Sequence, residues 1–149
     1  MSTTDEVATG GLPARVPELI DAKVPADRAE AVSAFAAAFT RRMTPQDLQE
    51  RTPEELLGVI LGAFELADTR GPDEFAVRVF EPSVTRDGYE ASGTVIEVST
   101  PDSPFLYDSV NEELQSWGLA VRRVIHPVIG IERGSDDRID RIVHVKDAP

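Results

Sequence analysis

The residues best suited to bind a small molecule lie between positions 102 and 109. Asp102, Ser103 and Pro104 come where a predicted strand is followed by a predicted helix. The first turn of a helix presents unpaired N–H groups with a partial positive charge, so an α-carboxylate could bind there while Asp102 or Asp108 accepts hydrogen bonds from an ammonium group. The alternative is that Asp102 or Ser103 only caps the helix. Both interpretations remain open at the level of sequence.

Patterns required for independent catalysis are missing from the sequence. The glycines form neither G-x-G-x-x-G nor G-x-x-x-x-G-K, so no nucleotide-binding turn is expected. Lys23 and Lys146 are the only lysines and lie far from the centre of the chain, which argues against a proton-transfer lysine in the core. There is no cysteine, which excludes thiolate metal ligands and a cysteine nucleophile. We therefore expect no catalytic residue, no bound cofactor and no metal in this chain.

The two histidines, His126 and His144, fall on neighbouring predicted strands. No carboxylate or thiolate accompanies them at metal-ligand spacing, so they make at best half a metal site. Ser109 lacks the G-x-S-x-G pattern of an exposed nucleophile, although Asp108 and His126 could lie near it. We expect Ser109 to be an ordinary residue on a helix face, and we keep His126 as a second contributor to a site at residues 102–109.

The charge and hydropathy of the chain exclude several classes of partner. Its 149 residues include 27 acidic and 15 basic ones, and the net charge of -12 repels nucleic acid and anionic membrane surfaces. The longest apolar run, residues 56–64, is far shorter than the roughly 20 residues of a membrane span. Residues 1–11 lack the features of a signal peptide, and the absence of cysteine fits a reducing compartment. We expect a cytoplasmic protein.

The first half of the chain predicts helices. Residues 1–23 show no periodicity and are expected to form a disordered or loosely docked leader. Apolar residues at helical spacing predict a helix over residues 26–41. Residues 44–47 and 52–55 each place Thr before Pro and an acid, the pattern of a capped helix start. In the second of these helices, Gly58 and Gly62 leave a smooth strip that another backbone can approach closely.

The second half predicts four strands and one helix. Alternating apolar residues predict strands near residues 75–81 and 94–99, and a helix is expected over about 106–117, closed by Gly118. A long third strand over 119–131 and a fourth over 139–145 follow. The order ββαββ predicts an α+β fold in which helices cover one face of a four-stranded antiparallel sheet. We divide the chain into a leader (1–23), a helical segment that packs on the sheet (24–72) and the sheet itself (73–149), with 24–149 forming one structural domain.

Two motifs carry a resemblance to a known family. D-S-P-F-L-Y-D-S-V at residues 102–110 resembles the D-x-P-F-L-x-D-S-V signature of the large bacterial NAD-specific glutamate dehydrogenases, and V-I-H-P-V at 124–128 resembles the strand that follows it there. Similar segments at 51–56, 70–72 and 77–82 extend the resemblance over about residues 26–145. The sequence departs from the family at Gly93, where we expect His, and at Tyr107, where we expect an aliphatic residue.

The resemblance implies an N-terminal ACT-like domain of a very long enzyme that converts L-glutamate to 2-oxoglutarate with NAD. In this enzyme, NAD would bind to the catalytic domain and not to the ACT-like domain. ACT domains commonly bind amino acids near the first strand-to-helix loop, which corresponds to residues 102–109. We therefore expect a regulatory or assembly module, in contact with other domains and subunits of the parent, that senses a free amino acid. The alternative is a purely structural interaction domain with no ligand. The expected effector-binding residues are Asp102, Ser103, Pro104, Phe105, Leu106, Asp108 and Ser109, with His126 as a second contributor.

Overall fold

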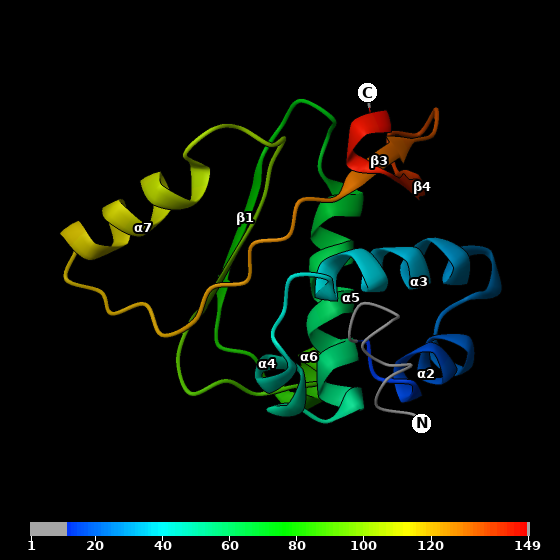
Figure 1. Ribbon diagram of the computed structural model, residues 1–149, viewed down its shortest axis with the longest axis horizontal. Coiled ribbons are helices and arrows are strands. Elements are labelled where there is room, and N and C mark those ends of the chain that lie inside the picture. Colours follow the sequence, from blue (N-terminus) through cyan, green and yellow to red (C-terminus); the bar gives the residue numbers. More distant parts are fainter. Residues whose placement is uncertain (1–11, 149) are drawn as a thin grey trace.

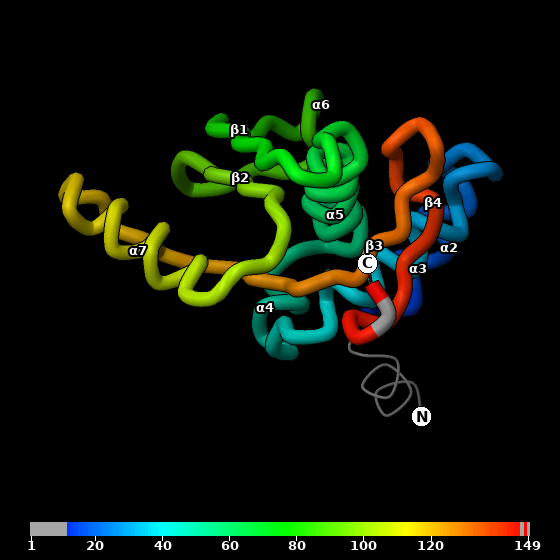
Figure 2. The backbone as a smooth tube through the Cα atoms, turned by 90° about the horizontal axis from the view of Figure 1, so that it is seen from above, coloured from blue at the N-terminus to red at the C-terminus, as the bar shows by residue number. Residues whose placement is uncertain are grey.

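The computed structural model describes residues 12–148 and has an α+β fold (Figures 1 and 2). Four helices come first: α2 (Arg15–Lys23), α3 (Ala26–Thr40), α4 (Pro45–Gln49) and α5 (Pro53–Thr69). They are followed by β1 (Ala76–Phe80), α6 (Val84–Asp87), β2 (Val95–Ser99), α7 (Leu106–Ser116), β3 (Gly130–Arg133), β4 (Ile139–Val143) and the short 3-10 helix η1 (Val145–Asp147). The predicted α+β class is confirmed.

Helices α4 and α5 begin at the predicted capping boxes. The Thr52 hydroxyl accepts a hydrogen bond from the Glu55 backbone N–H at 3.1 Å, and the Glu55 carboxylate accepts one from the Thr52 N–H at 3.0 Å. Thr44 and Asp47 make the same reciprocal pair at the start of α4. Each box satisfies N–H groups that would otherwise lack a partner at a helix start. The sequence therefore fixes where both helices begin.

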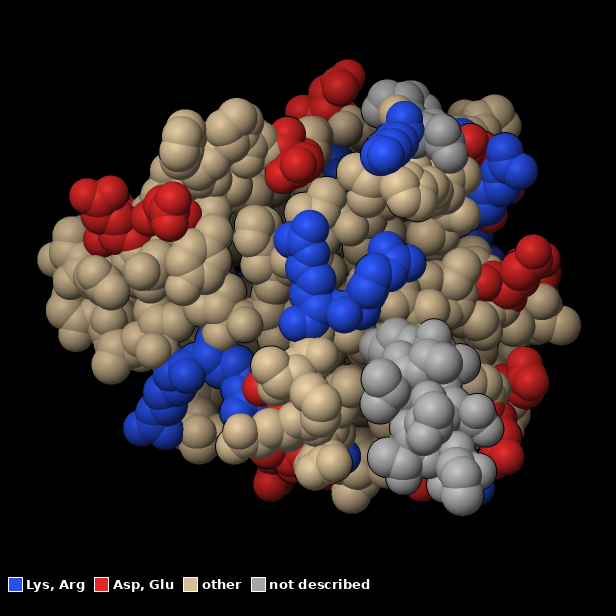
Figure 3. All heavy atoms as spheres, viewed as in Figure 1, with Lys and Arg blue, Asp and Glu red and all other residues tan. Residues whose placement is uncertain are grey.

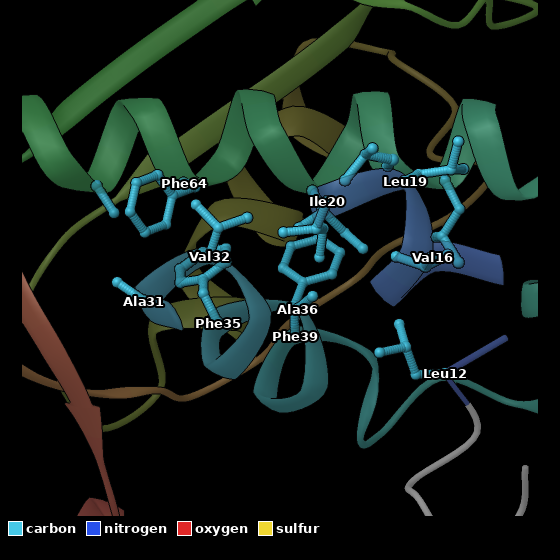
Figure 4. Packing of buried hydrophobic residues seen from close by; sticks show 14 of the residues in the cluster. Leu12, Val16, Leu19, Ile20, Ala31, Val32, Phe35, Ala36, Phe39 and Phe64 are labelled. Carbon is cyan, nitrogen blue, oxygen red and sulfur yellow. The ribbon is translucent and has the colours of Figure 1, made fainter. Parts of the chain in front are cut away.

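The hydrophobic core lies between α2, α3 and α5 (Figure 4). Phe35 of α3 stacks on Phe39 with 6.0 Å between ring centroids and meets Phe64 of α5 edge-on at 5.2 Å. Edge-on aromatic pairs add stability beyond the area they bury. The most deeply buried side chains of these three helices are Val16, Ile20, Val32, Ala36, Leu56, Leu57 and Ile60. These helices form the main body of the fold.

Helix α2 is an element that the sequence analysis did not predict. Val16, Leu19 and Ile20 of this helix are buried in the core, although they fall within the expected disordered or loosely docked leader. The structure therefore differs from that expectation over residues 12–23, whereas residues 1–11 lie outside the described residues. The three apolar residues have helical spacing, but they provide barely two turns, and Pro17 interrupts the pattern. Proline is tolerated there because it lies in the first turn of the helix.

The strands form two separate antiparallel pairs instead of one four-stranded sheet. In the first pair, Ala76 lies opposite Ser99 and Phe80 opposite Val95. In the second, Gly130 lies opposite Val143, and the register shifts between Glu132 and Arg133. Figures 1 and 2 show the two pairs on opposite sides of α5. The predicted four-stranded sheet with helices on one face is therefore not formed within the described residues.

The long third strand of the prediction is missing because most of its residues pair with no other strand. Only Gly130–Arg133 forms β3, and the preceding residues 119–129 run as an irregular segment from α7 to the main body (Figure 1). Ile125 and Ile129 pack against the helical core, and Arg123 forms ion pairs with Asp47 and Glu50 beside α4. Pro127 also has no N–H to donate to a strand ladder. Contacts with helices therefore replace the expected pairing.

One buried carboxylate, that of Asp68 near the end of α5, joins the helices to β4. Asp68 is 4% exposed and accepts hydrogen bonds from Arg28 at 2.7 Å, from Arg138 at 2.6 and 3.0 Å, and from the Ile139 N–H at 2.8 Å. Arg28 also donates to the Ile139 carbonyl at 2.8 Å. Burial by itself raises the pKa of Asp68, but the hydrogen bonds from Arg138 and Ile139 and the charges of Arg28 and Arg138 outweigh it, so the pKa is lowered. The C-terminal hairpin is thus tied to α3 and α5 through one side chain.

We expect Asp68→Ala to destabilise the chain by about 2–4 kcal/mol, because it removes charge-assisted hydrogen bonds and leaves the buried Ile139 N–H without its acceptor. The free energy of unfolding from urea titration measures the effect. Asp73→Ala is the matched control, since Asp73 is exposed. Equal stabilities for the two variants would contradict the assigned role of Asp68.

The lowered pKa of Asp68 also predicts a pH dependence. Its contribution to stability is fully present above the ordinary aspartate pKa of about 3.9 and is lost as the pH falls through the lower, folded-state pKa. Wild type should therefore lose stability more steeply than Asp68→Asn when the pH is lowered below about 4. Urea titrations at a series of acidic pH values measure both slopes, and parallel slopes would rule out this linkage.

Candidate functional site

The predicted binding segment forms an exposed turn and the start of α7. Phe105 precedes the first helical residue with a positive φ of 62°, and it makes no side-chain capping bond. Neither Asp102 nor Ser103 makes a hydrogen bond that caps α7. The cap-only interpretation therefore does not describe this structure, and the first-turn N–H groups of α7 have no side-chain cap.

Little of this segment is enclosed by the rest of the molecule. Residues 101–105 and 107–110 are exposed, and Leu106 is half-buried. No residue of α7 is buried, and the helix extends away from the main body (Figures 1 and 2). Asp102, Asp108 and Ser109 thus lie on an exposed turn and helix start.

His126 lies beside Tyr107 in the first turn of α7. Its ring stacks on the Tyr107 ring, with 6.1 Å between centroids and 29° between planes. His144 is elsewhere, at the start of η1, where its Nδ1 accepts a hydrogen bond from the Lys146 N–H at 3.2 Å. The two histidines therefore do not lie on neighbouring strands. Over residues 12–148, no three His, Cys, Asp or Glu side chains come close enough together to hold a metal ion.

A groove of about 540 Å³ lies between α5 and the segment that contains β1 and α6. It is separate from residues 102–109, none of which lines it. Its wall on α5 is formed mainly by Leu57, Gly58, Leu61, Gly62, Glu65, Leu66 and Thr69, and the opposite wall by Arg78, Arg86, Asp87, Gly88 and Tyr89. Of these residues, only Gly58 and Gly62 were indicated by the sequence as a place of close approach.

The two glycines of α5 allow close approach in different ways. A Cβ at Gly58 would lie 2.5 Å from the Asp87 carbonyl oxygen, so the end of α6 contacts the bare helix backbone there. A Cβ at Gly62 would lie 3.4 Å from Glu97 Oε2, which is ordinary contact. The predicted close approach of another backbone is confirmed at Gly58, whereas Gly62 faces a side-chain carboxylate.

An ion cluster lines the strand side of the groove. The Asp87 carboxylate accepts hydrogen bonds from Arg78 at 2.7 Å, from Arg86 at 3.0 Å and from the Ser83 N–H at 2.9 Å. The hydrogen bond from Arg86 lowers the pKa of Asp87 most, and those from Ser83 and Arg78 add to this effect against the opposing effect of burial. Arg78 also lies over the Phe80 ring, with 3.7 Å from the guanidinium carbon to the ring centroid. Asp87 therefore accepts hydrogen bonds from both arginines.

The carboxylate of Glu97 has fewer hydrogen-bond partners than that of Asp87. Its side chain is 13% exposed, and its Oε1 lies 3.5 Å from Arg78 Nη1, with no hydrogen-bond donor among the described residues. Burial raises the pKa of Glu97 more than Arg78 lowers it, and the charges of Asp87 and Glu65 raise it further. Burial likewise raises the pKa of nearby Tyr89, and the charge of Glu97 adds to that shift. Glu97 is thus a largely buried carboxylate without a hydrogen-bond donor among the described residues.

The β1–β2 pair turns the face that carries Arg78 and Glu97 toward α5, and an apolar face outward. Val77 lies opposite Val98 and Val79 opposite Ile96, and these four side chains are 41–62% exposed. The opposed pair Arg78 and Glu97 faces the other way, toward Gly62. Sequence analysis expected helices to cover the apolar face. The opposite charges of Arg78 and Glu97 on paired strands were the signal that this face could be the buried one. Alternation of apolar and polar residues alone does not reveal which face is buried.

Charged side chains on the face shown in Figure 3 occur in separate groups. Among the described residues on this face, the basic groups do not join into a continuous band, and acidic side chains lie on the protruding part at the left (Figure 3). This face therefore offers no extended basic surface for a polyanion.

No helix within residues 12–148 combines the length and hydropathy required to cross a membrane.

Gly58→Ala and Gly62→Ala form a matched pair that tests the groove. Alanine is favoured over glycine inside a helix by about 1 kcal/mol. At Gly58 the added Cβ would collide with the Asp87 carbonyl oxygen, so we expect a net loss of about 1–3 kcal/mol. At Gly62 we expect no loss or a small gain. Thermal or urea unfolding measures both variants, and equal effects would contradict the close contact at Gly58.

Comparisons with known proteins agree with the motifs at residues 102–110 and 124–128. A NAD-specific glutamate dehydrogenase of Halomonas elongata is 30% identical over 134 residues, which cover 89% of this chain and 8% of the relative. One of Pseudomonas aeruginosa is 30% identical over 112 residues, 75% of this chain and 7% of the relative. No solved structure matches the chain. The family model described as glutamate dehydrogenase, ACT1 domain, matches residues 35–149, and the chain belongs to this family.

Proposed function

We propose that this chain is a regulatory or assembly module of a NAD-dependent glutamate dehydrogenase that converts L-glutamate to 2-oxoglutarate. Membership of the ACT1 family and the names of the two relatives support this proposal. The chain spans less than a tenth of either relative, so catalysis is assigned to the remainder of the parent enzyme. Within the chain, we propose that residues 24–149 act as one structural domain together with α2, which shares their core, with 24–72 as its helical segment and 73–149 as its strand-containing part.

The described residues do not suit NAD. A dinucleotide site requires a glycine-rich turn between a strand and a helix, so that the backbone can approach the pyrophosphate. Residues 100–105, between β2 and α7, contain no glycine, and neither do residues 81–83 between β1 and α6. NAD is therefore assigned to another part of the parent enzyme, and the partners of this chain are an amino-acid effector and neighbouring domains or subunits.

The effector site of this proposal is the first turn of α7. Its uncapped N–H groups can donate to the α-carboxylate of an amino acid, where the helix dipole favours negative charge. Asp102 and Asp108 supply acceptors for the ammonium group, and the stacked rings of Tyr107 and His126 lie beside the same turn. The other contributors are Ser103, Pro104, Phe105, Leu106 and Ser109. The uncapped helix start beside a stacked histidine is the observation that supports sensing most directly.

A thermal-shift screen of the twenty amino acids tests this site. At a hundredfold excess over its dissociation constant, a true effector should stabilise the chain by about 2.7 kcal/mol. Asp108→Asn should weaken the response, because the amide carries no charge to attract the ammonium group. Asp73→Asn should leave it unchanged, since Asp73 is exposed on a different segment. No response to any amino acid would contradict the effector role.

The second candidate is a purely structural domain with no ligand, and the outer face of β1–β2 favours it. Phe75, Val77 and Val79 are 51–73% exposed, and Ile96 and Val98 continue the apolar surface. Contiguous apolar surface on a folded protein marks interaction sites. In this function, the outer face contacts a neighbouring domain or subunit of the parent enzyme.

Hydrogen exchange tests the structural role. The β1–β2 amides should exchange at least about tenfold more slowly in a longer chain that includes the neighbouring domains than in the present chain. Val79→Thr keeps strand propensity but makes the face more polar, so it should reduce this difference. Val84→Thr is the control, since Val84 is 57% exposed on α6. Equal exchange in both chains would contradict docking through this face.

A further inference from the structure

We propose that helix α7 is a movable arm that folds onto the outer face of β1–β2. The centre of this face is formed by four exposed aliphatic side chains, those of Val77, Val79, Ile96 and Val98. In the structure α7 extends away from the main body and leaves the face uncovered (Figures 1 and 2). The inference rests on two exposed apolar surfaces of one chain, on their matching dimensions and on the backbone at both ends of α7.

Helix α7 has an apolar stripe that is not buried. Its apolar residues recur at spacings of four, four and three, which places them on one side of a helix. They are Leu106, Val110, Leu114 and Trp117. No residue of α7 is buried, and Trp117, directly after the helix, is 71% exposed. An apolar stripe of this kind normally packs on a core, so α7 is suited to cover an apolar surface that it does not cover in this arrangement.

The outer face of β1–β2 has the dimensions of one short helix. Each strand has five residues, or about 17 Å at ~3.4 Å per residue. Helix α7 has 11 residues, or about 16 Å at ~1.5 Å per residue. Two paired strands lie about 4.8 Å apart and a helix is about 10 Å wide, so a single helix covers a two-stranded pair. Closure removes apolar side chains of both surfaces from water, which favours it.

Residues with positive φ flank α7 at both ends. Phe105 before the helix has φ 62°, and Gly118 after it has φ 75°. Positive φ is uncommon for a residue that carries a side chain, and such conformations collect at switch regions. Residues 100–105 connect β2 to α7, and a connection of about two to six residues is long enough to fold a helix back on the preceding strand. Rotation in this connection therefore brings α7 to the outer face without disturbing the strands.

The segment that follows α7 is exposed and can move with it. Within the described part of the chain, residues 119–122 make one side-chain hydrogen bond, from Arg122 to the Ser92 hydroxyl at 3.0 Å. Both side chains are exposed, so breaking this bond costs little. The movement can thus extend as far as Arg123, whose ion pairs hold the chain beside α4.

The chain's own α7 is favoured over the α7 of a second copy as the cover of this face. The connection to β2 keeps α7 near the face at an effective concentration on the order of millimolar. A second copy must instead associate against a net charge of -12 on each chain. Closure also withholds the face from a neighbouring domain, so α7 competes with docking. This consequence rests on the second candidate function, whereas the closure itself does not.

Cysteine crosslinking tests the closure, because the chain has no cysteine of its own. Val110→Cys on the stripe and Val79→Cys on the outer face are combined and treated with a short bismaleimide. The expected product is a crosslink within one chain, seen as a faster band on a denaturing gel. In the control, Glu112→Cys replaces Val110→Cys on the opposite side of α7 and should react at least about fivefold less. A crosslinked dimer, equal yields from both pairs or no crosslink at all would overturn the proposal.

Fluorescence of Trp117, the single tryptophan of the chain, provides a second test without a label. Val79→Asp places a charge on the outer face and should release α7, so acrylamide should quench Trp117 about twofold more strongly than in wild type. Val79 is 62% exposed, so folding of this variant is not at risk. Val84→Asp on α6 is the control and should be quenched as wild type is. Equal quenching of wild type and Val79→Asp would contradict the closure.

Discussion

The arrangement of this chain depends on the buried carboxylate of Asp68. Its acceptor oxygens bind Arg28 of α3, Arg138 before β4 and the first N–H of β4, so one side chain orients three parts of the molecule. A buried carboxylate is costly unless it is surrounded by donors, and here the donors come from segments far apart in sequence. Ile139 is thereby held in the helical core, where it is 1% exposed. The C-terminal hairpin then lies on one side of α5 and leaves the other side to β1–β2.

On that other side, α5 determines what the strands can present. The backbone at the end of α6 packs closely against Gly58, and Gly62 leaves space for the Arg78 and Glu97 side chains. The face of β1–β2 that carries Arg78 and Glu97 therefore packs inward, and Val77, Val79, Ile96 and Val98 remain outside. An outward apolar face suits a module that docks to other domains, and the uncapped start of α7 suits one that also senses a ligand. Both properties fit the proposed place of the chain in a much larger dehydrogenase.

Local signals in the sequence predicted a large part of this structure. The capping boxes fixed the starts of α4 and α5, the apolar spacing located the core residues of α3, and the motif at residues 102–110 indicated the family. Apart from helix α2, which was not predicted, the errors concern long-range pairing. Alternation of apolar and polar residues predicts that a segment is extended, but it does not predict which face of the strand is covered. It also does not identify the partner, and residues 119–129 pack against helices instead of another strand. The groove was missed for the same reason, because Arg78 and Asp87 meet α5 only in three dimensions.

The central claim is that Asp68 couples the helices to the C-terminal hairpin, and a double-mutant cycle between Asp68 and Arg138 tests it most directly. Asp68→Ala, Arg138→Ala and the double variant are unfolded in urea, and the coupling energy is the departure from additivity. We predict a coupling above about 1 kcal/mol, since the two side chains share hydrogen bonds of 2.6 and 3.0 Å. Additivity within about 0.3 kcal/mol would contradict this account.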